Sequence, residues 1–356
     1  MMRHMLMDDS LTSAEQNQVL HLAAQMREDR SLRRPFEGPK TVALLFDLPS
    51  TRTRVSFATG VAELGGHSLV IDTGASQLGR GEPIADTARI LSRMNHMIVW
   101  RTSGHERLVE MAEHASVPVI NALTDAGHPC QILADFATIA QRRDGLEESG
   151  PALAGRTLAY CGDGANNMAA SYLIGGALAG MHVRVAAPAG WAPSAETVQR
   201  ASAIAAETGG SVTVTEDPRE ACLGAQVIAT DTWVSMGTEK DERIERALRP
   251  YEVTEELMAL GDDALFLHCL PAYRGMEVAA SIIDGPASAV WDEAENRLHA
   301  QKALMTFLAD AASSSTGQAT TGEAATGEAT TGPADTRAPG DSAHPSAPTA
   351  TMEAAR

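Results

Sequence analysis

Short runs of β-branched and apolar residues alternate along this chain with longer segments that have the spacing of amphipathic helices. Strands separated by helices of this length form right-handed βαβ units, which build parallel sheets. The pattern occurs twice, on either side of a Gly- and Glu-containing segment at about 144–155. We therefore predict an α/β chain with two doubly wound parallel-sheet domains joined by helices. The expected strands are 41–46, 68–72, 97–100 and 117–120, then 157–161, 182–186, 211–215, 226–230 and 265–268.

The expected boundaries are 1–143 for the first domain, 144–291 for the second, and 292–310 for a C-terminal helix. Residues 311–356 differ in composition, because Thr-Gly pairs recur every five residues from Thr316 to Gly332 and Pro, Ala and Ser follow. Such a segment buries too little apolar surface to offset its ordering entropy. We predict a low-complexity, disordered C-terminal tail rather than a solenoid, whose repeats need bulky side chains to pack.

Charge and cysteine content exclude several classes of protein. The 356 residues include 46 acidic and 28 basic side chains, a formal net charge of −18, whereas nucleic-acid binders need surplus Lys and Arg. No apolar stretch reaches the roughly 20 residues of a membrane span or resembles a secretory signal. The four cysteines have no C-x-x-C spacing. We expect a cytoplasmic protein with free thiols and with no nucleic-acid or membrane partner.

The motif Ser50-Thr51-Arg52-Thr53-Arg54 follows the first predicted strand and begins a helix. Ser50 suits the N-cap, and the first helical turn leaves backbone amides without intrahelical partners. These amides, the positive end of the helix dipole, the hydroxyls and a guanidinium would form a phosphate-binding site. A capped helix with two solvated arginines would have the same residues, and the Gly-rich pattern of a nucleotide P-loop is absent.

His128-Pro129-Cys130-Gln131 also lies where a strand leads into a helix. Pro129 suits the first helical position, which leaves His128 at the carboxyl edge of the sheet and Gln131 about one turn later. An imidazole there can donate to a carbonyl oxygen, and a carboxamide can pair with a planar amide. Arg101, after the third strand, would share this edge, where open parallel sheets bind ligands. Simple helix capping is the alternative.

Three further motifs follow predicted strands of the second domain. Gly162-x-Gly164 lacks the third glycine of a dinucleotide fingerprint, so we interpret it as a tight turn that presents Asn167. The loop 231–237 contains a carboxylate, a hydroxyl and free amides that could hold both ends of an α-amino acid. In His268-Cys269-Leu270-Pro271, the proline interrupts the ladder and leaves carbonyls facing the crevice. The simpler alternatives are an ordinary loop with a capping Asp at 231–237 and a buried core residue at Cys269.

The order of these motifs resembles the ornithine carbamoyltransferase family from about 46 to 308: S-T-R-T-R, H-P-C-Q, D-x-x-x-S-M-G, H-C-L-P and E-N-R-L-H-A-Q-K-A. Aspartate carbamoyltransferases lack the S-M-G loop and the H-C-L-P cysteine, and the acetylornithine and putrescine branches differ in the amino-acid loop. The resemblance implies a carbamoyl-phosphate-binding first domain, an ornithine-binding second domain and a C-terminal helix that packs back on the first.

The resemblance also assigns residues. Carbamoyl phosphate would be bound by Ser50, Thr51, Arg52, Thr53, Arg101, His128, Gln131, Cys269, Leu270 and Arg297, with Gln77 supplied across a homotrimer interface. L-ornithine would be bound by Asn167, Asp231, Ser235 and Met236. Arg101, His128, Cys269 and Asp231 would be catalytic, with no metal and no organic cofactor.

The implied reaction gives L-citrulline and phosphate, in arginine biosynthesis. The alternatives are a carbamoyltransferase for another amine or amino acid, a non-catalytic sensor of phosphate metabolites on the same fold, and a dinucleotide oxidoreductase based on Gly162-x-Gly164. Tyr273 and Leu48 depart from the family pattern, and we expect them to affect binding strength rather than reaction type.

Overall fold

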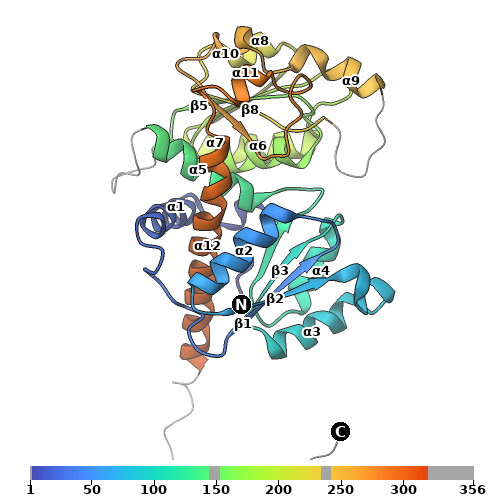
Figure 1. Cartoon of the computed structure of the whole chain (residues 1–356), viewed down its shortest axis with the longest axis vertical. Helices are drawn as coiled ribbons and strands as arrows, with labels where there is room; N and C mark the ends of the chain where they lie inside the picture. The colour runs from blue at the N-terminus through green and yellow to red at the C-terminus, as the bar shows by residue number, and fades with distance from the viewer. Residues whose placement is uncertain (1, 144–152, 234–241, 320–356) are drawn as a thin grey trace, which may run out of the picture.

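Two lobes, each built on a parallel sheet, are connected by one long helix, α12 (Figure 1). The structure is a computed structural model that describes residues 2–143, 153–233 and 242–319. Alternate residues of β1 (Thr41–Phe46) pack into two different apolar clusters, with Val42 and Leu44 on one face and Ala43 and Leu45 on the other. Because both faces are covered, the strand is apolar throughout rather than alternating. The predicted doubly wound α/β fold is confirmed.

The first sheet has the strand order β2-β1-β3-β4, with all pairs parallel. The chain moves outward from β1 to β2 and then returns to the other side of β1 with β3, so the strand order reverses between β1 and β3. Ligand crevices of open α/β sheets form at such switch points. The remaining elements of this lobe are β2 (His67–Asp72), β3 (Met97–Arg101), β4 (Val119–Leu123), α2 (Thr51–Glu63), α3 (Ile84–Met94), α4 (His105–His114) and α5 (Pro129–Arg143), with η2 (Thr73–Ala75) and η3 (Leu78–Arg80) after β2.

The second sheet has the order β7-β6-β5-β8-β9, also parallel, and its switch point lies between β5 and β8. Its strands are β5 (Thr157–Cys161), β6 (His182–Ala186), β7 (Ser211–Thr215), β8 (Val227–Thr230) and β9 (Leu265–His268). Its helices are α6 (Asn167–Leu178), α7 (Ala195–Thr208), α8 (Pro218–Cys222), α9 (Glu242–Leu248), η4 (Arg249–Tyr251), α10 (Glu255–Met258) and α11 (Ala280–Ile283).

All nine predicted strands are present, with end shifts of up to three residues. The last helix, α12 (Val290–Ala319), differs more, because it continues past Asp310, where we expected the folded chain to end. Ala311 and Ala312 favour helix, and the Ser313 hydroxyl donates to the Ala309 carbonyl at 2.9 Å. The predicted disorder of residues 320–356 concerns residues outside the described part of the chain.

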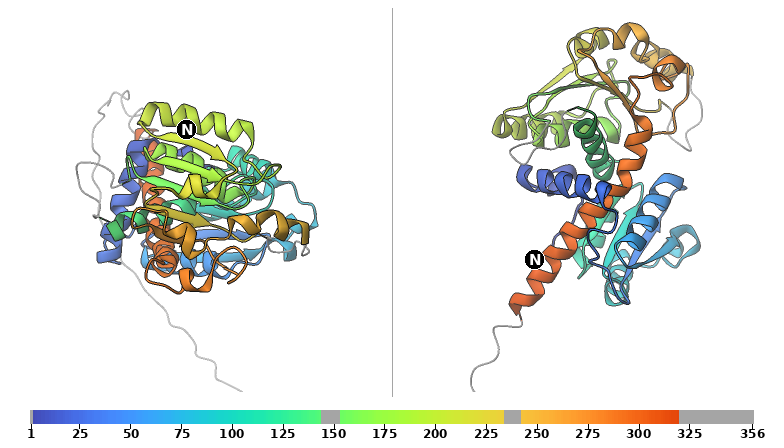
Figure 2. Two further views of the ribbon diagram at one scale, coloured as in Figure 1. Left: turned by 90° about the horizontal axis from the view of Figure 1, so that it is seen from above. Right: turned by 60° about the vertical axis from the view of Figure 1, so that its left-hand side comes forward.

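The N-terminal segment joins the two lobes. Met5 pairs with β4 at Ile120, and η1 (Asp8–Ser10) packs on α6 of the second lobe. Helix α1 (Ser13–Glu28) follows and lies beside α12 where the lobes meet (Figure 2). In the described residues, no helix is long and apolar enough to cross a membrane.

Candidate active site

Loops at the carboxyl edges of the two sheets face each other, and side chains bond across the junction between the lobes, which we call the crevice. Arg52 Nη2, from the first turn of α2, donates to the Leu270 carbonyl after β9 at 2.6 Å. Asn167 Nδ2, at the start of α6, donates to the Thr124 carbonyl after β4 at 2.7 Å. Loops that lie far apart in the sequence therefore form one site at both switch points.

The N-terminus of α2 forms the cationic part of this site. Ser50 occupies the N-cap, but its hydroxyl makes no cap bond and instead lies 3.4 Å from Arg101 Nη1, which is 3.5 Å from Thr53 Oγ1. The backbone N–H groups of this first turn therefore remain available to donate hydrogen bonds to a ligand. Burial, and then the charge of Arg297, lower the pKa of Arg101 to about 10, so it remains a cation at neutral pH. Arg52, Arg101 and Arg297 repel one another, and an anion would relieve that repulsion.

Gln131 is held in the same cluster by a buried polar network. Arg297 donates to Gln131 Oε1 at 2.6 Å and to Thr53 Oγ1 at 2.6 Å. Gln131 Nε2 donates to Asp135 at 2.8 Å and to Glu293 at 2.9 Å. Burial raises the pKa of Asp135 to about 6, and burial together with the Asp135 charge raises the pKa of Glu293 well above its usual value. Both groups therefore hold a proton more readily than a solvent-exposed carboxyl group does.

His128 lies beside these cations as a neutral ring. Burial, reinforced by the charges of Arg297 and Arg101, holds its pKa well below the usual value. Its backbone N–H donates to Ser171 Oγ of α6 at 2.8 Å, which fixes the start of α5 against the second lobe. A neutral imidazole can donate one hydrogen bond to a developing oxyanion without carrying a charge of its own.

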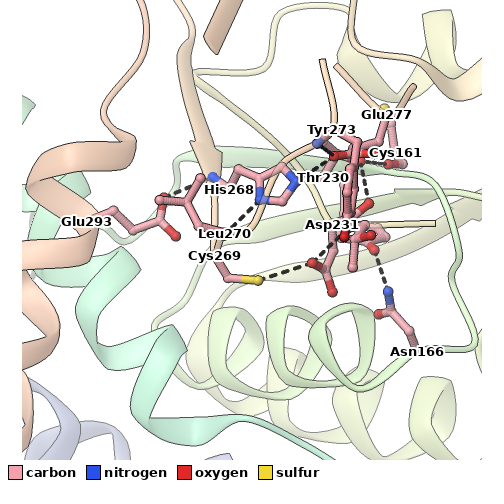
Figure 3. Close-up of polar contacts among 12 residues, drawn as sticks. Cys161, Asn166, Thr230, Asp231, His268, Cys269, Leu270, Tyr273, Glu277 and Glu293 are labelled. Atoms are coloured by element: carbon pink, nitrogen blue, oxygen red, sulfur yellow. Dashed lines mark hydrogen bonds and ion pairs between the residues drawn. The ribbon is translucent and has the colours of Figure 1, made fainter. Parts of the chain in front are cut away.

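The second lobe contributes Asp231 after β8 and Cys269 after β9 (Figure 3). Cys269 Sγ lies 3.1 Å from Asp231 Oδ1. Burial and the Asp231 charge raise the pKa of Cys269 well above its usual value, so the group is a thiol that donates to the carboxylate. Ser235 and Met236, which were predicted in the following loop, lie outside the described residues.

Asp231, His268 and Cys269 also place three potential metal-ligand atoms within 4.8 Å of one another. The thiol is held protonated, and the Leu270 backbone N–H already donates to His268 Nδ1 at 2.9 Å. A cation bound here would have to replace the Cys269 thiol proton and the hydrogen bond from the Leu270 N–H to His268. The donor set therefore fits a hydrogen-bonded network better than a metal centre.

Not every predicted residue joins the cluster. Gln77 precedes η3 in the loop after β2 and is exposed, and Thr51 faces outward at the start of α2. Thr51 lines a cavity of about 510 Å³ together with Pro49, Ser50, Arg54, Val55 and Asp72. Tyr273 and Leu48, the two departures from the expected pattern, are 47% and 39% exposed. They lie on the surface rather than among the converging side chains.

Gly162-x-Gly164 has a packing role that explains its glycines. A Cβ on Gly164 would lie 2.9 Å from Ala187 Cβ and 2.9 Å from Pro193 Cδ. The turn is therefore tight because protein atoms fill the space beside it, and Asn166 caps α6 by accepting from the Ala169 N–H at 2.8 Å. This agrees with the tight-turn interpretation and removes the basis of the dinucleotide alternative.

Several buried polar residues of the site were missed from the sequence. Glu293 was not predicted, yet it is buried and bonds to Gln131, as the predicted Arg297 does. Asp135 could have been predicted as a neighbour of Gln131 from its spacing, because it follows Gln131 by four residues and so lies on the same helical face. Ser171 carried no such signal, since its partners Asp8 and His128 are distant in the sequence.

Two family models match the chain. The aspartate/ornithine carbamoyltransferase, carbamoyl-P binding domain model matches residues 3–141, and the aspartate/ornithine carbamoyltransferase, Asp/Orn binding domain model matches residues 154–308. An ornithine carbamoyltransferase of Bifidobacterium longum subsp. infantis is 60% identical over 313 residues, which cover 87% of this chain and 96% of that protein. That of Clavibacter sepedonicus is 59% identical, with 86% and 99% covered.

Solved structures agree with these relatives. The ornithine carbamoyltransferase from Pyrococcus furiosus superposes with a TM-score of 0.80 at 43% identity, covering 86% of this chain and 96% of that one. The anabolic ornithine carbamoyltransferase from Campylobacter jejuni gives a TM-score of 0.80 at 35% identity, covering 87% and 100%. The similarity extends through both lobes.

Proposed function

The chain belongs to the aspartate/ornithine carbamoyltransferase family, and we propose that it transfers the carbamoyl group of carbamoyl phosphate to the δ-amine of L-ornithine, giving L-citrulline and phosphate. It is a carbamoyltransferase. The observation that carries the proposal is the convergence of Arg52, Arg101 and Arg297 on one side of a crevice whose other side holds Asp231 and Cys269.

Carbamoyl phosphate would bind on the cationic side. The α2 amides with Ser50, Thr51 and Arg52 would hold the phosphate, since a helix N-terminus and guanidinium groups favour this anion. Arg101, His128 and Thr53 would donate to the carbamoyl oxygen. Gln131 and the carbonyls of Cys269 and Leu270 would accept from the carbamoyl nitrogen, and Arg297 would stabilise Gln131 and the phosphate together.

Ornithine would bind on the opposite side, with Asn167, Asp231, Ser235 and Met236 around its α-amino and α-carboxylate groups. The neutral δ-amine nitrogen attacks the carbamoyl carbon, the bond from that carbon to the phosphate oxygen breaks, and the amine loses a proton as phosphate departs. The Cys269 thiol and the Asp231 carboxylate would orient the amine and guide that proton. Each donor aimed at the developing oxyanion typically contributes about 3–4 kcal/mol.

The direct test is citrulline formation by the purified chain with ornithine, putrescine, aspartate and acetylornithine in parallel. Turnover with ornithine alone supports the proposal. Turnover with one of the other amines alone would identify a different carbamoyltransferase. Carbamoyl phosphate binding without turnover of any amine would favour the sensor.

We further infer that the chain is a cytoplasmic homotrimer of arginine biosynthesis. The four cysteines are free thiols, as a reducing compartment requires. The similar Campylobacter jejuni enzyme is described as anabolic. The cavity beside Ser50 opens at the β2 edge of the first sheet, where Leu69 and Val70 are each 42% exposed. A neighbouring subunit that covered this edge would bury them and could bring its Gln77 to the phosphate.

A further inference from the structure

His268, the last residue of β9, has all three of its nitrogen atoms beside a specific partner (Figure 3). Its backbone N–H donates to Glu293 Oε2 at 2.9 Å, and its Nδ1 accepts from the Leu270 N–H at 2.9 Å. Its Nε2 lies 3.3 Å from Glu277 Oε1. Because Nδ1 is an acceptor, the ring proton is on Nε2, the nitrogen beside Glu277, and the two groups are in polar contact without a well-aligned hydrogen bond.

Glu277 is fully buried, and its side chain contacts the turn that precedes it, residues 268–273. One of its oxygens accepts the backbone N–H of Tyr273, three residues after Leu270. The same oxygen faces the His268 ring. A buried carboxylate needs groups that compensate its lost hydration, and for Glu277 the Tyr273 N–H and the His268 ring, both of the 268–273 turn, contact Oε1.

The turn needs this support because Leu270 has a left-handed backbone, with φ of 57°. A non-glycine residue in this region is strained and persists where its surroundings fix it. The bond from the Leu270 N–H to His268 is one such constraint. It orients the next peptide group, whose carbonyl faces the first lobe and accepts from Arg52.

We propose that Glu277 is a positioning residue for carbamoyl transfer, acting through the His268 ring to hold the Leu270 carbonyl where it accepts a hydrogen bond from the carbamoyl nitrogen. This inference rests on the proposed function. Glu277 touches no reacting group, and Glu293 anchors the other side of His268 through the backbone. Loss of Glu277 should therefore weaken recognition of the carbamoyl amine while leaving phosphate recognition intact.

Acetyl phosphate separates these two effects, because it keeps the phosphate and the carbonyl but replaces the amine with a methyl group that cannot donate. In Glu277→Ala we expect the KM for carbamoyl phosphate to rise about tenfold, the effect of one lost hydrogen bond, while the Ki of acetyl phosphate as a competitive inhibitor stays within twofold. Glu277→Gln keeps an oxygen acceptor for His268 and should restore most of the difference.

His268→Ala breaks the same link from the other side and is measured in the same way, so the test survives if one variant fails to fold. His299→Ala is the matched control, since His299 is also buried and lies 3.6 Å from a glutamate, Glu295, but outside the crevice. It should leave the KM/Ki ratio unchanged. If the unmodified chain forms no citrulline, the proposed function is wrong. If it forms citrulline and the ratio is unchanged in Glu277→Ala and His268→Ala, the positioning role is wrong.

Discussion

Gln131 has a fixed amide orientation, and that orientation limits the hydrogen bonds it can make to a ligand. Its Nε2 donates to both Asp135 and Glu293, so both amide protons are used. Its Oε1 accepts from Arg297 and keeps a second lone pair. Towards a substrate, Gln131 can therefore accept but not donate, which matches the amine of a carbamoyl group and not the methyl of an acetyl group.

Arg52 and Asp231 lie on opposite sides of the crevice, so their removal should affect different substrates. We expect Arg52→Ala to raise the KM for carbamoyl phosphate about a hundredfold, the effect of a lost charge-assisted hydrogen bond, with little change for ornithine. Asp231→Ala should raise the KM for ornithine by a similar factor. Initial rates with each substrate varied give both values, and Arg89→Ala, an exposed arginine of α3, is the control. Equal effects on both substrates would contradict this division.

Asp8 should make folding stability depend on pH. It is buried, the Ser171 hydroxyl donates to it at 2.7 Å, and burial raises its pKa from 3.8 to about 7. The unfolded chain therefore loses this proton first as the pH rises. The stability that neutral Asp8 provides is complete below about pH 4 and is lost by about pH 7.

Asp8→Asn removes this dependence but keeps an oxygen that can accept from Ser171. We expect the unfolding free energy of Asp8→Asn to exceed that of the unmodified chain. This difference should grow between pH 4 and pH 7, towards about 4 kcal/mol. Urea unfolding at fixed protein concentration measures the difference at each pH. Other titrating groups, including Asp9 and Arg200 nearby, are common to both proteins and cancel. A difference that does not change with pH would be inconsistent with a buried, proton-binding Asp8.

The site could be predicted where its residues form short motifs directly after strands. Arg52, His128 and Gln131 needed only the rule that parallel strands present their following loops at one edge. Glu293 could not be predicted in this way. Spacing on α12 pairs it with Arg297, and only the packing of α12 against α5 and β9 gives it Gln131 and the His268 amide as partners.

Among the elements, the strands were predictable because each is a local apolar run with clear ends. The shift in β4 has a long-range cause. We expected it at 117–120, but Pro118 has no N–H for the ladder, and the strand runs from Val119 to Leu123. Its outer edge pairs with Met5, whose N–H donates to the Val119 carbonyl at 2.9 Å and whose carbonyl accepts from Asn121 at 2.8 Å. No local pattern reveals a pairing across more than a hundred residues.

The packing of α12 on α2 depends on one buried ion pair. Lys302 Nζ donates to Glu63 at 2.7 Å and to the Arg30 carbonyl at 2.6 Å, and its side chain is fully buried. Lys302→Ala should lower the unfolding free energy by about 1.5–3 kcal/mol, the value of a hydrogen bond to a charged group, while Glu63 keeps its second ion pair, with Arg30.

The double variant Lys302→Met with Glu63→Gln removes both charges and should lose less than Lys302→Ala alone. Arg33→Ala breaks the exposed ion pair between Arg33 and Asp310 of α12, and should change the unfolding free energy by less than about 1 kcal/mol. Urea midpoints rank the three proteins. A loss from Lys302→Ala no larger than that from Arg33→Ala would show that the pair does not hold α12 in place.

For the whole molecule, the crevice contrasts with the chain around it. The formal net charge is −18, yet Arg52, Arg101 and Arg297 gather at one sheet edge. Interactions between exposed charges are screened beyond about 8 Å at physiological salt, so the acidic surface has little influence inside the crevice. An anion that bound here would therefore be held by local donors, and one of them, Ser50, also lines the cavity at the β2 edge.

If a neighbouring subunit supplies Gln77, two inactive chains should restore each other. Arg52→Ala lacks the phosphate ligand of its own site, and Gln77→Ala lacks the residue it would give to its neighbour. In trimers reassembled from an equal mixture, a site is intact when a Gln77→Ala chain receives Gln77 from an Arg52→Ala neighbour, which applies to about a quarter of sites. We expect citrulline formation to recover towards that fraction of the unmodified rate, and light scattering to give the trimer mass. Each variant unfolded and refolded alone is the control. Mixed chains no more active than the separate variants would mean that each chain completes its own site, because Arg52 and Gln77 would then have to lie on one polypeptide.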